Sequence, residues 1–243
     1  MSLINHAINS VNKIFYNYQF NFPDGNQKEF QVDFDSESLQ SKLSDGTDYP
    51  EWSLLECHQC KNCPLSSEDY LYCPLAVNLV PIIYWCKDLV SYDDVDVVIT
   101  SAERKVSAHT SLQRAVSSLL GLLMSSSACP KMKFLRPLAR FHLPLATHEE
   151  TIFRAVSATL LRDYFDEKER KNNEDPLGKL KQQYQGLQDI NRFIANRVRS
   201  AIERDAAINA IVLLDILSKK VSFSMDDSLQ QIRYLFEDNK SSI

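Results

Sequence analysis

An alternation of aromatic and polar residues on both sides of an Asp-Gly pair constrains the fold more than any other feature of this sequence. Aromatic residues occupy every second position at Tyr16, Tyr18, Phe20 and Phe22. After the pair Asp24-Gly25, the alternation resumes at Phe30, Val32 and Phe34. Period-two patterns around Asp-Gly predict an antiparallel hairpin with strands over 16–22 and 30–34. Because an isolated hairpin is barely stable in water, its aromatic face should pack against helices of the same chain.

A third strand and several helices complete the predicted architecture. Val95, Val97 and Ile99 alternate with aspartates, which predicts another strand. Apolar residues at helical spacing predict helices over 74–89, 112–123, 153–164, 180–198, 206–217 and 225–236. Capping boxes at Thr110–Gln113 and Thr147–Glu150 should begin two of them. The predicted fold class is therefore α+β and mostly helical, with an N-terminal antiparallel β-hairpin and a third strand packed on a helical bundle, and with a Cys-rich loop.

One charged segment divides the chain. Eight of the eleven residues from Asp166 to Pro176 are charged, which is typical of a solvated loop. Residues 1–165 then hold the hairpin, the Cys-rich loop and the first helices, and residues 177–243 hold the C-terminal helices. We expect the two parts to pack together as one domain.

Composition and charge argue against several classes of function. The chain has 27 Lys and Arg against 32 Asp and Glu, a net charge of −5, so no nucleic-acid partner is expected. No run approaches the roughly 20 continuous apolar residues of a membrane span. The N-terminus also lacks the basic and apolar regions of a secretory signal. We therefore expect a cytoplasmic protein, whose cysteines act as metal ligands or reactive thiols before they form disulfides.

The cysteines form the clearest chemical motif. Four of the six lie within seventeen residues at the spacing C-x2-C-x2-C-x9-C, namely Cys57, Cys60, Cys63 and Cys73. A C-x2-C pair presents two sulfur atoms from a single turn, and structural zinc sites are closed by four Cys or His ligands. The sequence predicts a zinc-thiolate site, with Cys60 and Cys63 as its central pair and Cys73 as a third ligand.

The fourth ligand and the metal itself stay open at this point. Besides Cys57, the fourth ligand could be His58, Cys129 or His142. An iron–sulfur cluster is the main alternative cofactor, because C-x2-C-x2-C with a later Cys-Pro is similar to bacterial ferredoxin patterns. The gap before Cys73 is nine residues rather than three, however, so the spacing is not diagnostic. The thiols could also be buried small hydrophobic groups without metal, which is the interpretation we favour for Cys86.

A second group of residues allows two further hypotheses. Cys129, His142 and His148 lie near one another in the sequence, with acidic residues just beyond, which would suit a thiol-dependent hydrolase. Cys129 follows a predicted helix instead of preceding one, so a helix N-terminus would not activate its thiolate. Anion binding by Arg136 and Arg140 is the other hypothesis for this segment.

The same motifs carry a resemblance to a known family. The strings that carry it are Cys57-His-Gln-Cys-Lys-Asn-Cys-Pro-Leu, Cys73-Pro-Leu-Ala, Cys129-Pro and Ala139-Arg-Phe-His-Leu-Pro. Together they resemble an uncharacterised bacterial family, a domain of unknown function with the pattern Q-C-x-x-C-P-L, C-P-x-A, C-P and A-R-F-H-L-P. The family pattern includes Gln59, Cys60, Cys63, Cys73 and Cys129, whereas Cys57 lies outside it. The resemblance implies a bacterial protein and supplies no activity.

These observations favour a non-enzymatic regulatory or interaction protein with a structural zinc-thiolate site. Its helical part would bind a protein partner or a second copy of the chain. The alternative is an iron–sulfur or redox-sensing protein that uses the same cysteines, and a Cys/His-dependent enzyme is the third possibility. No catalytic residue is assigned, because the sequence contains none of the common phosphate-loop, nucleophile-elbow or zinc-protease motifs.

Overall fold

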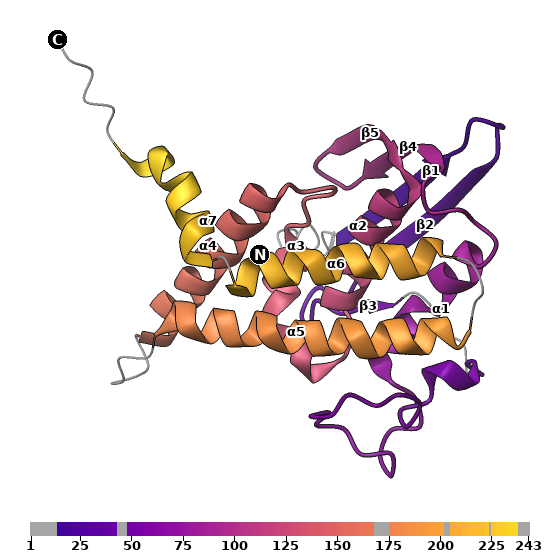
Figure 1. Ribbon diagram of the computed structural model, residues 1–243, viewed down its shortest axis with the longest axis horizontal. Coiled ribbons are helices and arrows are strands. Elements are labelled where there is room, and N and C mark those ends of the chain that lie inside the picture. The colour runs from indigo at the N-terminus through magenta and orange to yellow at the C-terminus, as the bar shows by residue number, and fades with distance from the viewer. Residues whose placement is uncertain (1–13, 43–47, 168–174, 202–204, 224, 238–243) are drawn as a thin grey trace, which may run out of the picture.

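The chain folds as an antiparallel sheet packed against helices (Figure 1). The computed structural model describes residues 14–42, 48–167, 175–201, 205–223 and 225–237. The strands are β1 (Ile14–Asn21), β2 (Gln27–Phe34), β3 (Ser41–Lys42), β4 (Asp94–Thr100) and β5 (Lys105–Ser111), in the spatial order β3-β2-β1-β4-β5. The predicted hairpin and third strand are confirmed as β1, β2 and β4. Strand β5 was not predicted, and it pairs antiparallel with β4.

The register of the sheet places the aromatic side chains on one buried face. Tyr18 lies opposite Phe30 on β2 and opposite Ile99 on β4. The Tyr18 and Phe20 side chains are fully buried, and Trp85 packs with its ring centroid 4.8 Å from that of Phe20. Because side chains alternate between the two faces of a strand, this register puts the polar residues of β1 on the opposite face.

Seven α-helices and three short 3-10 helices occur in the described ranges. The α-helices are α1 (Pro74–Cys86), α2 (Leu112–Ser125), α3 (Arg136–Arg140), α4 (His148–Glu167), α5 (Pro176–Arg199), α6 (Ala206–Phe223) and α7 (Met225–Ile232). The 3-10 helices are η1 (Glu51–Ser53), η2 (Pro130–Leu135) and η3 (Arg233–Phe236). The predicted α+β class, mostly helical, is confirmed. None of the described helices is both long enough and apolar enough to cross a bilayer.

Local sequence explains where two of the long helices begin. At the start of α4, the Glu150 backbone N–H donates to the Thr147 hydroxyl (3.2 Å), and the Thr147 backbone N–H donates to the Glu150 carboxylate (2.7 Å). This is the reciprocal pattern of a capping box, as predicted. At α5, the Asp175 carboxylate accepts from the backbone N–H of Leu177 (3.1 Å), and Pro176 fits the first turn, where no N–H partner is needed.

The capping box predicted at Thr110 is wrong. Pairing of β5 with β4 continues through Ser111, so Thr110 lies in a strand opposite Val95. Helix α2 begins one residue later, and its N-cap Ser111 makes no side-chain capping bond. Strand pairing therefore overrides the local capping signal at this junction.

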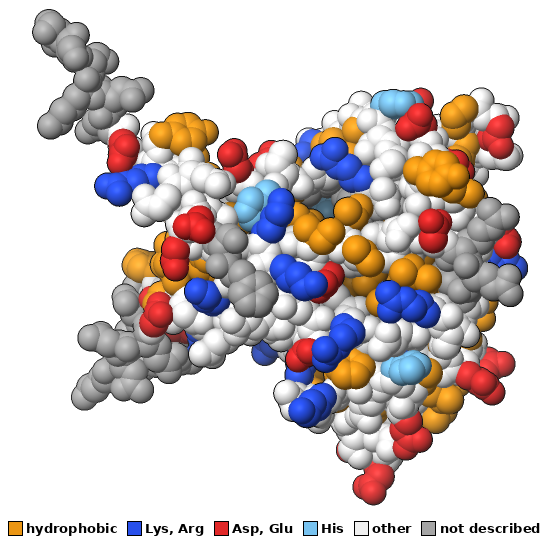
Figure 2. Space-filling model, in the orientation of Figure 1, with side chains coloured by type: hydrophobic (Ala, Val, Ile, Leu, Met, Phe, Trp, Pro, Cys, Tyr) orange, Lys and Arg blue, Asp and Glu red, His pale blue; other side chains and the backbone are white. Residues whose placement is uncertain are grey.

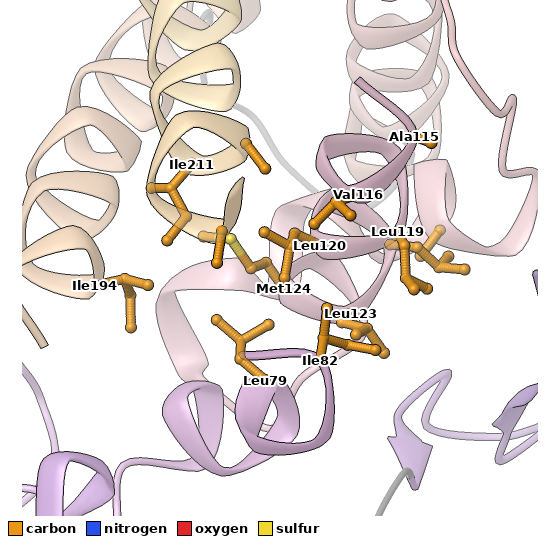
Figure 3. Close-up of a cluster of buried hydrophobic side chains, with 14 of the residues drawn as sticks. Leu79, Ile82, Ala115, Val116, Leu119, Leu120, Leu123, Met124, Ile194 and Ile211 are labelled. Atoms are coloured by element: carbon orange, nitrogen blue, oxygen red, sulfur yellow. The ribbon is translucent and has the colours of Figure 1, made fainter. Parts of the chain in front are cut away.

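A single hydrophobic core joins residues from both predicted parts of the chain. In Figure 3, Leu79 and Ile82 of α1 face Leu120, Leu123 and Met124 of α2, with Ile194 of α5 and Ile211 of α6 beside them. Helices α5 and α6 run side by side across the molecule. The core therefore positions the loop between η1 and α1, and the segment between α2 and α4, against the same set of helices.

Candidate functional site

The Cys-rich loop runs from η1 to α1 and is closed by backbone hydrogen bonds between its two ends. The backbone N–H of Leu55 donates to the Leu71 carbonyl (2.9 Å), and that of Cys73 donates to the Ser53 carbonyl (2.8 Å). Within the loop, the Cys63 N–H donates to the Cys60 carbonyl (2.9 Å), which forms a tight turn. The end of the loop therefore returns to its beginning, and Cys73 is the N-cap of α1.

A buried arginine attaches this loop to the helical bundle. The Arg197 side chain of α5 has only 1% of its surface exposed. Its Nη1 donates to the carbonyls of Trp52 (2.9 Å) and Leu54, and its Nη2 donates to the carbonyl of Leu55 (2.9 Å). Three backbone acceptors thus satisfy a cation that would otherwise be costly to bury. Sequence reasoning missed Arg197, because backbone carbonyls carry no side-chain signature.

Four thiols from two distant segments lie near one another. Burial, together with the thiols of Cys73, Cys63 and Cys129, raises the pKa of Cys60 to about 11, while Arg197 acts in the opposite direction. Burial likewise raises the pKa of Cys129 to about 11, and Cys73 and Cys63 contribute to that rise. Cys129, at the start of η2, therefore lies beside the loop cysteines, although more than fifty residues of sequence separate it from Cys73.

We call Cys60, Cys63, Cys73 and Cys129 the thiol cluster, because the thiols of the other three act on the pKa of Cys60. Neither Cys57 nor His58 is among the groups that affect the pKa values of Cys60 and Cys129. His58 is exposed and has a left-handed backbone with φ of 44°. Cys86 is fully buried, and burial alone raises its pKa to about 12, which agrees with the predicted core role.

The side chains of the thiol cluster are not arranged around a common centre. Across the described ranges, no three side chains among His, Cys, Asp and Glu are arranged so that they could hold a metal ion. Each cysteine sulfur can move by rotation about one χ1 bond without any movement of the backbone. The thiol cluster is thus a set of neighbouring cysteines whose side chains would have to turn toward a common centre to bind a metal.

A cavity of about 360 Å³ lies on the other side of η2. Its walls come from α2, η2, α3, α4, α5 and α6, and most of its lining side chains are apolar. Polar groups also reach it, among them Arg114, Ser118, Arg154, Tyr184 and Asn191. Figure 2 shows hydrophobic side chains gathered along α6 beside this hollow. A mostly apolar cavity with a few convergent polar groups is the usual form of a small-molecule site.

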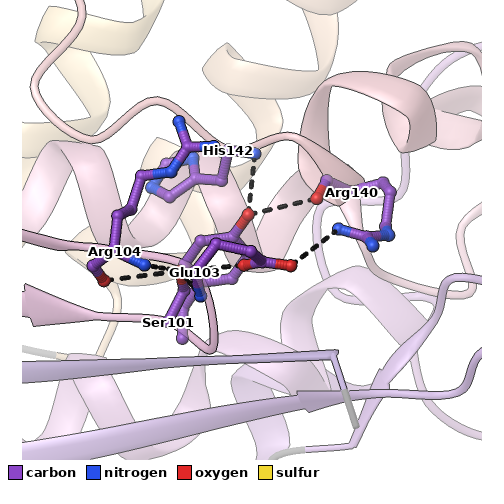
Figure 4. Close-up of polar contacts among 6 residues, drawn as sticks. Ser101, Glu103, Arg104, Arg140 and His142 are labelled. Carbon is purple, nitrogen blue, oxygen red and sulfur yellow. Dashed lines mark hydrogen bonds and ion pairs between the residues drawn. The ribbon is translucent and has the colours of Figure 1, made fainter. Parts of the chain in front are cut away.

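His142 lies at this cavity and has a separate hydrogen-bond network. Its Nε2 is 2.5 Å from the Tyr18 hydroxyl, which is in turn 2.8 Å from the Ser118 hydroxyl. The Tyr16 hydroxyl donates to the Arg140 carbonyl (3.1 Å) and accepts from the His142 backbone N–H (3.0 Å; Figure 4). Burial, together with the charge of Arg154, lowers the pKa of His142 to about 3, so the imidazole is neutral at pH 7.

The residues of the hydrolase and anion-binding hypotheses are not brought together. Cys129 belongs to the thiol cluster, whereas His142 bonds to Tyr18, and the Nε2 of His148 lies 2.9 Å from the Ser228 hydroxyl. Arg140 lies 4.0 Å from the Glu103 carboxylate. Arg136 lines a different hollow, together with Lys131, Lys133 and Arg162.

Comparison with known proteins gives one match. The model of a family described as a domain of unknown function (DUF6901) matches residues 16–237. The chain belongs to this family. The predicted resemblance to an uncharacterised family is thereby confirmed, and the DUF6901 match includes the thiol cluster, Arg197 and the cavity. No curated protein and no solved structure matches the chain.

Proposed function

We propose that this member of DUF6901 is a non-enzymatic bacterial regulatory or interaction protein in which zinc, held by Cys60, Cys63, Cys73 and Cys129, ties the Cys-rich loop to the helical core. The reducing cytoplasm is the compartment where these thiols would stay available. The gathering of three loop cysteines with a fourth from the start of η2 is the observation that carries this proposal.

Three features of the site support tetrahedral thiolate ligation. The Cys60–Cys63 turn presents two sulfurs from one short segment. Cys73 and Cys129 are each the N-cap residue before a Pro that begins a helix, and at Cys129 the backbone N–H groups of Lys131 and Met132 act to lower the pKa of the thiol. The guanidinium of Arg197 favours the thiolate form of Cys60. Burial opposes ionisation of these thiols, and a bound Zn²⁺ would reverse that effect because it binds the thiolate.

Exposed apolar side chains support the interaction part of the proposal. On α4, Leu161, Tyr164 and Phe165 are more than half exposed. Tyr234, Leu235 and Phe236 of η3 are also exposed, and Figure 2 shows hydrophobic side chains at this end of the molecule. Several large exposed apolar side chains on neighbouring elements commonly mark a protein–protein contact. A protein partner or a second copy of the chain would bind here.

Metal content per chain is the measurement that tests the zinc site. We expect purified protein to contain one zinc, and Cys60→Ser, Cys63→Ser, Cys73→Ser and Cys129→Ser each to lose it. Cys86→Ser is the matched control, because its buried thiol lies outside the thiol cluster. Retention of zinc by Cys129→Ser together with loss by Cys57→Ser would restore Cys57 as the fourth ligand.

The same preparations distinguish zinc from the alternative cofactor. Anaerobic purification that yields a brown protein with visible absorbance would indicate an iron–sulfur cluster at these cysteines. A colourless protein with no metal, whose four cluster thiols react freely while it stays folded, would contradict both forms of the proposal.

Self-association is tested separately. Sedimentation velocity over a range of protein concentrations should show a monomer–dimer equilibrium. Leu161→Glu should shift this equilibrium toward the monomer. Glu149→Lys on the same helix, at an exposed and already charged position, is the control. A monomer at every concentration would leave a different protein as the partner to be sought.

A further inference from the structure

The cavity between α2, α5 and α6 has an apolar interior and a cationic polar end. Its lining includes Leu187 of α5 and Leu214 and Leu217 of α6, together with Met124 of α2. Two arginines, Arg114 and Arg154, are also part of the lining, and none of its described lining residues is Asp or Glu. A site with this composition favours a ligand that is apolar along its length and negatively charged at one end.

Arg154 is the group at the polar end that most needs a partner. Its Nη2 donates to the carbonyls of Leu138 (2.9 Å) and Phe141 (2.7 Å). In the part of the chain that the structure describes, no carboxylate forms an ion pair with it, and its other N–H groups have no acceptor. A half-buried guanidinium held by two carbonyls keeps its charge and retains donors for a carboxylate.

The hydrogen-bond chain at His142 supplies a second donor to the cavity. The backbone N–H of Leu145 donates to the Ser118 hydroxyl (3.1 Å), which lies beside the hydroxyl of Tyr18. Both hydroxyl protons form hydrogen bonds when Ser118 donates to Tyr18 and Tyr18 donates to Nε2 of His142, so we assign the donors in this way. The imidazole proton is then on Nδ1, for which no described residue is an acceptor. His142 is partly exposed and lines the cavity, so this N–H is available to a ligand there.

We propose that this cavity binds a small amphipathic carboxylic acid, whose carboxylate lies against Arg154 and whose aliphatic body lies between α2, α5 and α6. A volume of about 360 Å³ is at the lower end of the range for drug-sized ligands. A medium-chain fatty acid combines an apolar body of suitable size with a single anionic group. The hydroxyl of Tyr184 and the amide of Asn191 also reach the lining and could bond to polar substituents on that body. This proposal does not depend on zinc binding at the thiol cluster.

The experiment is isothermal titration of the full chain with dodecanoate and, in parallel, with dodecanol, both below the concentrations at which they aggregate. Dodecanoate should bind, and dodecanol, which has the same aliphatic body without the charge, should bind at least about tenfold more weakly. Equal binding of the two probes, or no binding of dodecanoate, would overturn the proposal.

Two variants locate the binding within the cavity. Arg154→Met should weaken dodecanoate binding by about tenfold or more, because the carboxylate loses a charged donor. Leu217→Trp should block binding by filling the cavity, whereas Val212→Trp, at an exposed position of the same helix α6 outside the lining, should leave it unchanged. Circular dichroism verifies that each variant is folded, and if Arg154→Met does not fold, Leu217→Trp decides alone. Wild-type affinity in a folded Leu217→Trp variant would refute the assignment.

Discussion

Replacement of Arg197 by Met should detach the Cys-rich loop from the helical bundle. The side chain is almost completely buried and donates to the three carbonyls of Trp52, Leu54 and Leu55. Methionine fills a similar volume but cannot donate a hydrogen bond, so the carbonyls of Trp52 and Leu55 lose this donor, and that of Leu54 retains only the backbone N–H of Cys57 (3.2 Å). The loop ends also lose the contact that fixes them to α5.

The size of the effect follows from opposing contributions. A hydrogen bond to a charged group contributes about 1.5–3 kcal/mol, and the three bonds of one side chain are not additive. Loss of one partner in a buried charged network typically costs about 3–5 kcal/mol. Removal of the guanidinium also ends its own desolvation penalty, which offsets part of this loss. We therefore expect the free energy of unfolding to fall by about 3 kcal/mol, near the lower end of that range.

Urea unfolding followed by circular dichroism measures this change, and hydrogen exchange locates it. In Arg197→Met, the amides of Leu55 and Cys73, which close the loop, should exchange faster than those of the sheet. Arg199→Met is the matched control, because Arg199 is exposed and, within the described ranges, its side chain bonds to Asn196 alone (3.1 Å), so its loss should change stability by less than about 0.5 kcal/mol. Similar losses in the two variants, or unchanged exchange at Leu55, would refute the anchoring role of Arg197.

Three further predictions concern the sheet, a helix cap and a buried histidine. Phe20→Ala should lower the unfolding free energy by about 3–5 kcal/mol in urea, whereas Gln19→Ala on the opposite face should have little effect, and equal losses would contradict the register. Thr147→Ala should cost about 1 kcal/mol and Ser111→Ala much less, because only Thr147 makes a capping bond. Burial lowers the pKa of His142 from 6.5 to about 3, so the folded state resists its protonation. Stability should be complete above about pH 6.5 and fall by up to about 1.4 kcal/mol per pH unit as the pH drops toward 3. Urea midpoints at about pH 7 and about pH 5 should show a smaller decline for His142→Gln than for the wild type, and identical declines would argue against a neutral His142.

Local features of this fold could be predicted from the sequence because their causes are local. Strands β1 and β2 follow from alternation around Asp24-Gly25, where Gly25 adopts a φ of 88° that side chains rarely tolerate. The start of α4 follows from Thr147 and Glu150, which lie within one helical turn of each other. In each case the residues that interact are only a few positions apart, so the sequence contains the whole interaction.

The features that the sequence did not predict depend on distant partners. Strand β5 alternates only two apolar residues, Val106 and Ala108, with polar ones, and it pairs along the edge of β4. Arg197 looks like any basic residue near a helix C-terminus, and its partners are backbone carbonyls more than 140 residues away. That the charges of Cys73 and Cys63 act on the Cys129 thiol could not be read from the sequence, since only the folded chain brings η2 near the Cys-rich loop.

One continuous segment connects the thiol cluster to the cavity. Cys129 is the N-cap of η2, and Met132, Leu135 and Leu138, which follow it, line the cavity before the chain reaches His142. A metal bound at Cys129 would fix one end of this wall, and a ligand in the cavity would contact its middle. The two proposed sites would then influence each other through a shared element, and the coupling would be reciprocal, as thermodynamic linkage requires.

Zinc removal should therefore change the affinity for dodecanoate, and dodecanoate should change the affinity for zinc by the same factor. Titration of each ligand in the presence and absence of the other measures both factors, and two unchanged affinities would mean that η2 is rigid enough to isolate the sites.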